Sequence, residues 1–113
     1  MTAKKIYEIG EIPQMGEVPE EMYAWVIRED RVGVPEKAMQ IEKMPVQKPG
    51  KDEVLVMVMA VGINYNNVWA SQGIPISVIG EDTGYHIGGS DASGIVWAIG
   101  DNVKRWKVGD EVI

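Results

Sequence analysis

Three asparagines lie within four positions of one another, at Asn64, Asn66 and Asn67. An asparagine amide offers two N–H donors and one acceptor oxygen, and it carries no charge at any pH. Such groups suit the binding of a neutral or weakly polar ligand in a dry pocket. The same side chains also suit the capping of a helix and the pairing of loop backbone. Spacing alone favours capping, and the residues by themselves leave both interpretations open.

Nucleophilic catalysis by this chain alone is not expected. The chain has no cysteine, which excludes disulfides, thiolate zinc sites and cysteine nucleophiles. Ser90 and Ser93 lie in no Gly-x-Ser-x-Gly motif, and the single histidine, His86, is the only candidate base. A partly buried imidazole with a structural role is the favoured interpretation of His86.

The acidic residues near the C-terminal end do not predict a metal site. Asp101 and Asp110 each follow a glycine, where an aspartate usually hydrogen-bonds the local backbone. A structural role is therefore favoured for this group, which comprises Asp91, Asp101, Asp110 and Glu111. The glycine-rich run of residues 88–94 lacks the spacing of a dinucleotide fingerprint, and no Walker motif is present. No cofactor-binding loop is predicted within these residues.

Composition narrows the class of protein. The chain has 113 residues, of which 45% are hydrophobic, and this favours one small globular domain over a disordered segment. The net charge of −6 makes sequence-independent nucleic-acid binding a poor hypothesis. No apolar run approaches the length of a membrane span, and the N-terminus does not resemble a secretory signal. A cytoplasmic protein with neither nucleic-acid nor membrane partners is expected.

The elements that must position the asparagines are mostly strands. Composition and alternation predict strands at residues 22–28, 38–43, 54–61 and 92–99, with another beginning at 111–113. Residues 54–61 are apolar at every position and predict a central strand that is covered on both faces. A helix of about two turns is predicted over residues 64–72 and ends at Gly73, followed by a loop over residues 73–84. The pattern favours a mostly-β, barrel-like domain with one or two short helices.

The first 21 residues predict an extended arm, because spaced prolines and glycines oppose both helix and central strand. Apolar side chains could anchor this arm on another surface, and the candidates are Ile9, Ile12, Met15 and Val18. Residues 22–113 then form the domain. It stops inside an apolar strand at Ile113, so we expect it to be truncated at its C-terminus.

Several runs resemble crotonyl-CoA carboxylase/reductases of the medium-chain dehydrogenase/reductase superfamily. The Gly-x-Asp-x-x-Gly and Val-Gly-Asp-Glu-Val patterns are shared by the wider superfamily, whereas Asn-Tyr-Asn-Asn-Val-Trp-Ala is much more specific to the carboxylating enzymes. The matching runs are residues 7–11, 21–25, 38–42, 64–70, 85–100 and 104–112.

The resemblance implies an enzyme that reduces crotonyl-CoA with NADPH and captures CO2 to form ethylmalonyl-CoA. It also implies a GroES-like catalytic domain with a partial β-barrel, a Rossmann domain absent from this chain, a homo-oligomer and no zinc. This chain corresponds to the N-terminal part of the GroES-like domain. By this resemblance Asn66 binds CO2, and Asn64, Asn67 and Tyr65 support it.

Other family features lie beyond the residues given. The family's pocket glutamate and histidine, and its NADPH loop, have no counterpart here, and His86 does not correspond to that histidine. We therefore expect the 113 residues alone to be inactive. Two alternatives remain: a non-carboxylating enoyl-CoA or acrylyl-CoA reductase, and a free-standing GroES-like binding or assembly module.

Overall fold

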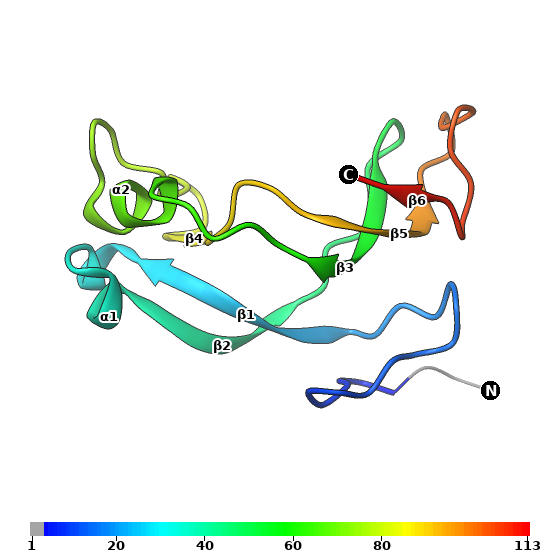
Figure 1. Cartoon of the computed structure of the whole chain (residues 1–113), viewed down its shortest axis with the longest axis horizontal. Coiled ribbons are helices and arrows are strands. Elements are labelled where there is room, and N and C mark those ends of the chain that lie inside the picture. Colours follow the sequence, from blue (N-terminus) through cyan, green and yellow to red (C-terminus); the bar gives the residue numbers. More distant parts are fainter. Residues whose placement is uncertain (1–3) are drawn as a thin grey trace. The chain divides into compact units, whose positions relative to one another are not determined.

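A computed structural model describes residues 4–113 (Figure 1). The backbone divides into two compact units: residues up to 22 with 44–61 and 91–113 form the first, and residues 23–43 with 62–90 form the second. The described residues contain two three-stranded sheets and two short α-helices, and they do not close a barrel. The prediction of a mostly-β fold with one or two short helices is confirmed.

The first unit contains a sheet with the order β3-β5-β6. These strands are β3 (Val54–Ala60), β5 (Ser93–Ile99) and β6 (Glu111–Val112), and both pairings are antiparallel. The prediction that residues 54–61 form a central strand is wrong, because β3 is an edge strand among the described residues and Val58 and Met59 are half exposed. The central strand is β5, in which Val96 is fully buried.

The second sheet has the order β2-β1-β4. Its strands are β1 (Glu21–Arg28), β2 (Met39–Pro45) and β4 (Tyr85–Ile87), and the 3-10 turn η1 (Glu29–Arg31) follows β1. β1 and β4 are antiparallel, with Ile27 opposite His86. Val26 and Ile27 of β1 are fully buried, which makes this strand the core of the second unit.

Two short elements were not predicted from the sequence. The helix α1 (Pro35–Ala38) occupies the start of the strand predicted from residue 38, so β2 begins one residue later. Proline at the first helical position favours this turn, because its φ is already helical and its missing N–H is not needed there. The strand β4 has only three residues, which is too short for alternation to reveal.

The helix α2 (Asn66–Gln72) confirms the helix predicted over residues 64–72. Gly73 ends it in the left-handed conformation with φ of 70°. Its N–H donates to the Ala70 carbonyl, and the Ile74 N–H donates to the Trp69 carbonyl. Glycine adopts this conformation without the steric cost that a Cβ would bring.

The N-terminal arm has no helix or strand over residues 4–20. It is joined to its own unit by polar contacts: Trp97 Nε1 donates to the Glu17 carbonyl at 2.9 Å, and the Glu21 N–H donates to the Lys5 carbonyl. The predicted apolar anchors Ile9, Ile12 and Met15 are each more than half exposed in this chain, so their anchoring on another surface stays a prediction. The boundary at residue 22 stays a prediction, and residues 1–3 of the arm lie outside the described part.

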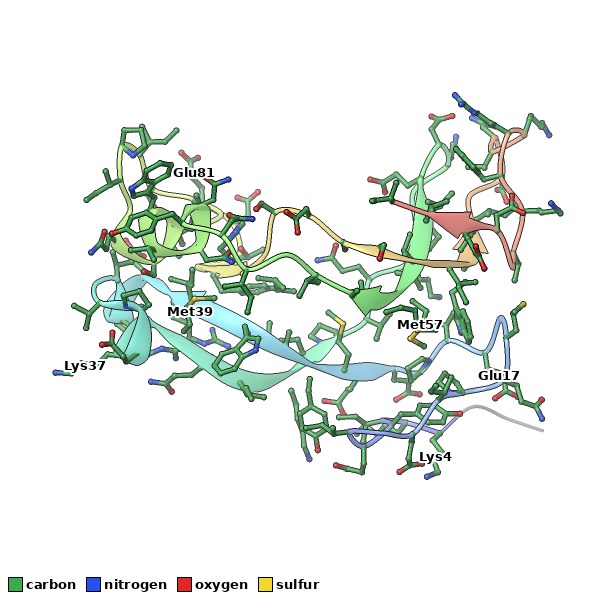
Figure 2. The ribbon with its side chains drawn as sticks, viewed as in Figure 1. Lys4, Glu17, Lys37, Met39, Met57 and Glu81 are labelled. Carbon is green, nitrogen blue, oxygen red and sulfur yellow. The ribbon has the colours of Figure 1, made fainter. Side chains whose placement is uncertain are left out.

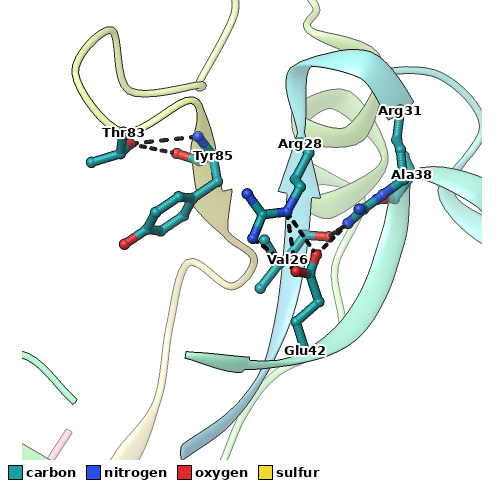
Figure 3. A network of polar contacts seen from close by, with 7 residues as sticks. All are labelled: Val26, Arg28, Arg31, Ala38, Glu42, Thr83 and Tyr85. Carbon is teal, nitrogen blue, oxygen red and sulfur yellow. Dashed lines mark hydrogen bonds and ion pairs between the residues drawn. The ribbon is translucent and has the colours of Figure 1, made fainter. Parts of the chain in front are cut away.

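A network of charged groups joins β1, η1 and β2 (Figure 3). Arg28 Nη2 donates to Glu42 Oε1 at 2.8 Å, and Arg31 Nη2 donates to Glu42 Oε2 at the same distance. Arg31 Nη2 also donates to the Val26 carbonyl at 2.9 Å. The hydrogen bonds from Arg28 and then Arg31 lower the pKa of Glu42 to about 2.

This network predicts acid sensitivity. A carboxyl whose pKa is lower in the folded state stabilises the fold above its ordinary pKa of about 4.5, and that contribution disappears as the pH falls toward 2. Glu42→Gln is therefore expected to lower the unfolding free energy at pH 7, and its difference from wild type should shrink toward pH 2. Urea unfolding across this range measures the effect, with the exposed Glu36→Gln as control. A pH-independent difference would contradict the assignment.

Candidate functional site

The asparagine run lies in the second unit, between the end of β3 and the first turn of α2. Asn64 is partly buried, and its Oδ1 accepts a hydrogen bond from the Asn66 N–H at 3.1 Å. Its Nδ2 lies 3.3 Å from Ser90 Oγ. Asn64 thus pairs backbone at the start of the helix from the residue before the capping position, which is the second of the two structural roles that the sequence suggested.

Asn66 and Asn67 are the first two residues of α2. Asn66 is exposed, and within the described residues its side-chain amide has no hydrogen bond. Asn67 is partly buried. The capping position itself is Tyr65, which is in helical conformation and makes no side-chain cap. The three asparagines therefore differ in availability, and the amide of Asn66 is exposed for a ligand.

The segment that contains Asn66 also carries exposed aromatic and aliphatic side chains. Tyr65 and Trp69 meet edge to face, with ring centroids 5.5 Å apart and an interplanar angle of 73°. Both rings are about half exposed or more. The same segment carries further exposed apolar residues, namely Ile63, Ile74 and Ile76. An uncharged amide beside apolar surface suits a ligand with a small polar group and a hydrocarbon part.

The helix is held from its far side by Ser71. This side chain is fully buried, and its hydroxyl donates to the Val68 carbonyl at 2.8 Å. The Ser71 carbonyl in turn accepts from the Gly33 N–H at 2.8 Å. The contact with Gly33 ties α2 to the segment that follows β1, so Asn66 and Asn67 stand on an anchored helix.

Ser90 is the site residue that sequence reasoning missed. The sequence suggests Ser90 only as a possible nucleophile, whereas its hydroxyl contacts the side chain of Asn64, 26 positions away. No spacing rule connects positions so far apart, so no local signal could have found this pair. In the described part of the chain, no hydrogen bond joins His86 to Ser90 or Ser93.

The other candidates have structural surroundings. His86 is partly buried in β4, and burial lowers its pKa, which favours the neutral imidazole. Asp110 accepts from the Lys107 N–H at 3.0 Å and from Lys107 Nζ at 2.7 Å, as expected for a turn aspartate. Over residues 4–113 no three acidic or histidine side chains gather as metal ligands.

The first unit contains an open hollow of about 770 Å³. Asn64, Asn66 and Asn67 do not line this hollow, so it is separate from the candidate site at the asparagines. Its walls come from residues 18–20, 46, 48–51 and 98–101.

Comparison with known proteins decides the family. The model of the alcohol dehydrogenase GroES-like domain matches residues 50–113. The chain belongs to this family. The matched region includes β3, β5 and β6 and the whole asparagine run, so the fold predicted from the sequence is confirmed.

The resemblance to crotonyl-CoA carboxylase/reductases is also confirmed. The enzyme of that name from Cereibacter sphaeroides is 60% identical over 111 residues, which cover 97% of this chain and 26% of the relative. Crotonyl-CoA reductase from Streptomyces avermitilis is 37% identical over 107 residues, covering 82% of this chain and 24% of the relative. This GroES-like chain therefore spans about a quarter of the length of the curated relatives it matches.

Solved structures agree with this assignment. A crotonyl-CoA carboxylase/reductase with 60% identity has a TM-score of 0.89, covering 97% of this chain and 26% of the other. The carboxylase/reductase AntE in complex with NADP is 50% identical with a TM-score of 0.84, covering 96% and 28%. The 2-octenoyl-CoA carboxylase reductase CinF with NADP and 2-octenoyl-CoA is 34% identical with a TM-score of 0.75, covering 83% and 26%. No helix in residues 4–113 could cross a membrane.

Proposed function

We propose that this chain works as part of an NADPH-dependent enoyl-CoA carboxylase/reductase that converts crotonyl-CoA and CO2 to ethylmalonyl-CoA. The observation that carries the proposal is 60% identity across almost the whole chain to an enzyme of that name. NADP in the AntE and CinF complexes supports the choice of cofactor, and 2-octenoyl-CoA in the CinF complex supports an enoyl-CoA substrate. Homo-oligomerisation and a cytoplasmic location stay predictions.

NADPH supplies the hydride that reduces the enoyl group, but the residues of this chain do not fit that cofactor. The 113 residues contain no glycine-rich dinucleotide loop between a strand and a helix. We expect the nucleotide to be bound by residues outside this sequence. The part proposed for this chain is the handling of CO2.

Asn66 is proposed to hold CO2 for attack by the electron-rich α-carbon of the reduced thioester. The amide N–H donates to an oxygen of CO2, and negative charge grows on that oxygen as the new carbon–carbon bond forms. A donor directed at this oxygen stabilises the transition state more than the neutral ligand. The exposed amide of Asn66 supports the assignment, as does the use of the Asn64 amide in other contacts.

The neighbouring side chains have supporting roles in this proposal. The exposed rings of Tyr65 and Trp69 offer apolar surface to the hydrocarbon part of the thioester. Asn64 sets the start of the helix, and Asn67 helps to shape its first turn. Apolar surface around the amide also strengthens its hydrogen bond, because water competes less for the donor.

The direct test is a product assay on the full-length gene product. Crotonyl-CoA, NADPH and CO2 are supplied, and the acyl-CoA products are identified by mass spectrometry. Ethylmalonyl-CoA is the expected main product, and without CO2 the simply reduced butyryl-CoA should replace it. Butyryl-CoA alone at saturating CO2 would favour the second candidate function, a non-carboxylating reductase. The similarity to crotonyl-CoA reductase supports this second candidate.

The isolated 113-residue chain is expected to show no NADPH oxidation dependent on crotonyl-CoA, because these residues lack a nucleotide loop. Absorbance at 340 nm measures the rate, with the full-length gene product as positive control. Sequencing the coding DNA beyond the codon of Ile113 is the companion experiment. An open frame that encodes a glycine-rich strand–turn–helix unit is expected, and turnover by the isolated chain would contradict the prediction.

A further inference from the structure

We propose that Ser90 is a positioning residue that controls the direction of the Asn66 side chain through Asn64. This inference rests on the proposed role of Asn66 in binding CO2. All three residues belong to the second unit, and Ser90 lies in the loop after β4.

Two hydrogen-bond contacts build the link. Ser90 Oγ lies 3.3 Å from Asn64 Nδ2 and 3.4 Å from Asn64 Oδ1. Asn64 Oδ1 accepts from the Asn66 N–H at 3.1 Å. The link therefore runs from the Ser90 hydroxyl through one amide group to the backbone of Asn66.

The chemistry of the amide makes this link directional. Only the oxygen of the Asn64 amide can accept from the Asn66 N–H, so Nδ2 must occupy the other side of the group. A hydroxyl can accept from Nδ2 and can also donate to Oδ1. The Asn66 N–H thus sets the amide orientation, and Ser90, which contacts both ends of the amide, limits rotation of the Asn64 side chain.

The loop that carries Ser90 is itself anchored on the sheet. The Gly88 N–H donates to the Trp25 carbonyl of β1 at 2.8 Å. A Cβ at Gly88 would lie 2.6 Å from the terminal methyl of Met39, a residue labelled in Figure 2. Trp25 precedes the fully buried Val26, so the loop is held beside the core of the second unit.

The link from Ser90 fixes the backbone position of Asn66. It therefore fixes the direction in which the Asn66 side chain points from the helix. Displacements of about 1 Å in a reacting group can lower a rate by up to about a hundredfold. Loss of the Ser90 hydroxyl should allow the Asn64 amide to turn and the start of α2 to move. Capture of CO2 should suffer more than hydride transfer, because only capture depends on the Asn66 amide.

The test compares Ser90→Ala, Ser90→Thr and Asn66→Ala in the full-length gene product. Ser90→Ala is expected to lower the ratio of carboxylated to reduced product by about threefold to tenfold, with the rate of NADPH oxidation largely kept. Ser90→Thr retains the hydroxyl and should restore the ratio. In an Asn66→Ala background, Ser90→Ala should lower the ratio no further, because both changes act on one group.

The outcomes separate this inference from the proposed function. If Asn66→Ala leaves the ratio unchanged, the CO2 role of Asn66 fails, and this inference fails with it. If Asn66→Ala lowers the ratio and Ser90→Ala does not, only the positioning role is overturned. A purely structural Ser90 would lower NADPH oxidation and thermal stability together at a constant ratio.

A second measurement keeps the inference testable if a variant is inactive. Hydrogen exchange of the peptide containing Asn66 should be faster in Ser90→Ala than in wild type, and Ser90→Thr should return it toward the wild-type rate. Unchanged exchange in Ser90→Ala would overturn the link whatever the activity.

Discussion

Asn66→Ala in the full-length gene product is expected to divert the reaction from the carboxylated to the simply reduced thioester. Removing one hydrogen-bond donor from a developing oxyanion lowers rates by about 10²–10³ in well-formed sites. Since protonation then competes with a slower carboxylation, the ratio of ethylmalonyl-CoA to butyryl-CoA should fall by at least about tenfold. Mass spectrometry of the products at several CO2 concentrations measures this ratio.

Asn67→Ala is the matched control, because it removes the same amide from the next position of α2. Its ratio should stay close to wild type, and NADPH oxidation should persist in both variants. If Asn67→Ala carries the shift instead, the family role belongs one position later. Unchanged ratios in both variants would contradict the assignment of CO2 binding to these asparagines.

Gly94→Ala is expected to destabilise the fold strongly. Gly94 lies in the central strand β5, opposite Val58 of β3 and Val112 of β6. A Cβ at this position would lie 2.1 Å from the Met57 carbonyl oxygen. That oxygen belongs to the backbone of β3, so relief requires the two strands to separate.

Overpacking a core with one methyl group usually costs about 1–3 kcal/mol, and overlap with backbone exceeds the lower part of this range. Gly94→Ala should lower the unfolding free energy by about 3 kcal/mol or leave no folded protein. Thermal and urea unfolding of the full-length gene product measure the loss, with soluble yield as the measure if no folded protein is recovered.

Gly50→Ala is the matched control in the same unit. Its added Cβ would lie 2.8 Å from the Glu53 carboxylate, which is the movable end of a flexible side chain. The expected loss is within about 1 kcal/mol. Equal stability of Gly94→Ala and Gly50→Ala would contradict close backbone packing between β5 and β3 at Gly94.

Local patterns predicted the elements whose causes are local. β1 and β5 follow from runs of β-branched and aromatic residues, and their bounds differ from the prediction by one residue at one end. The end of α2 at Gly73 follows from stereochemistry, because a left-handed residue there strongly favours glycine. The family resemblance likewise rested on contiguous runs, which a sequence displays directly.

Local sequence patterns did not predict features that depend on which segments pack together. The apolar residues of β3 predict a covered strand, yet the strand lies at an edge of its sheet among the described residues. Composition records that a strand can be buried, but not which other strands will pair with it. The exposed Ile9 and Ile12 of the arm show the same limit, because an apolar side chain does not reveal its partner.

The family and the mostly-β architecture follow from the amino-acid sequence, and the same residue runs place the proposed site. The three asparagines could be told apart only after folding. The Asn64 amide contacts both the Ser90 hydroxyl and the Asn66 N–H, whereas the Asn66 amide is exposed. The ion pairs of Arg28 and Arg31 with Glu42 were likewise visible only in the structure. The physical reason is distance along the chain: hydrogen bonds and ion pairs between distant positions exist only after folding brings them together.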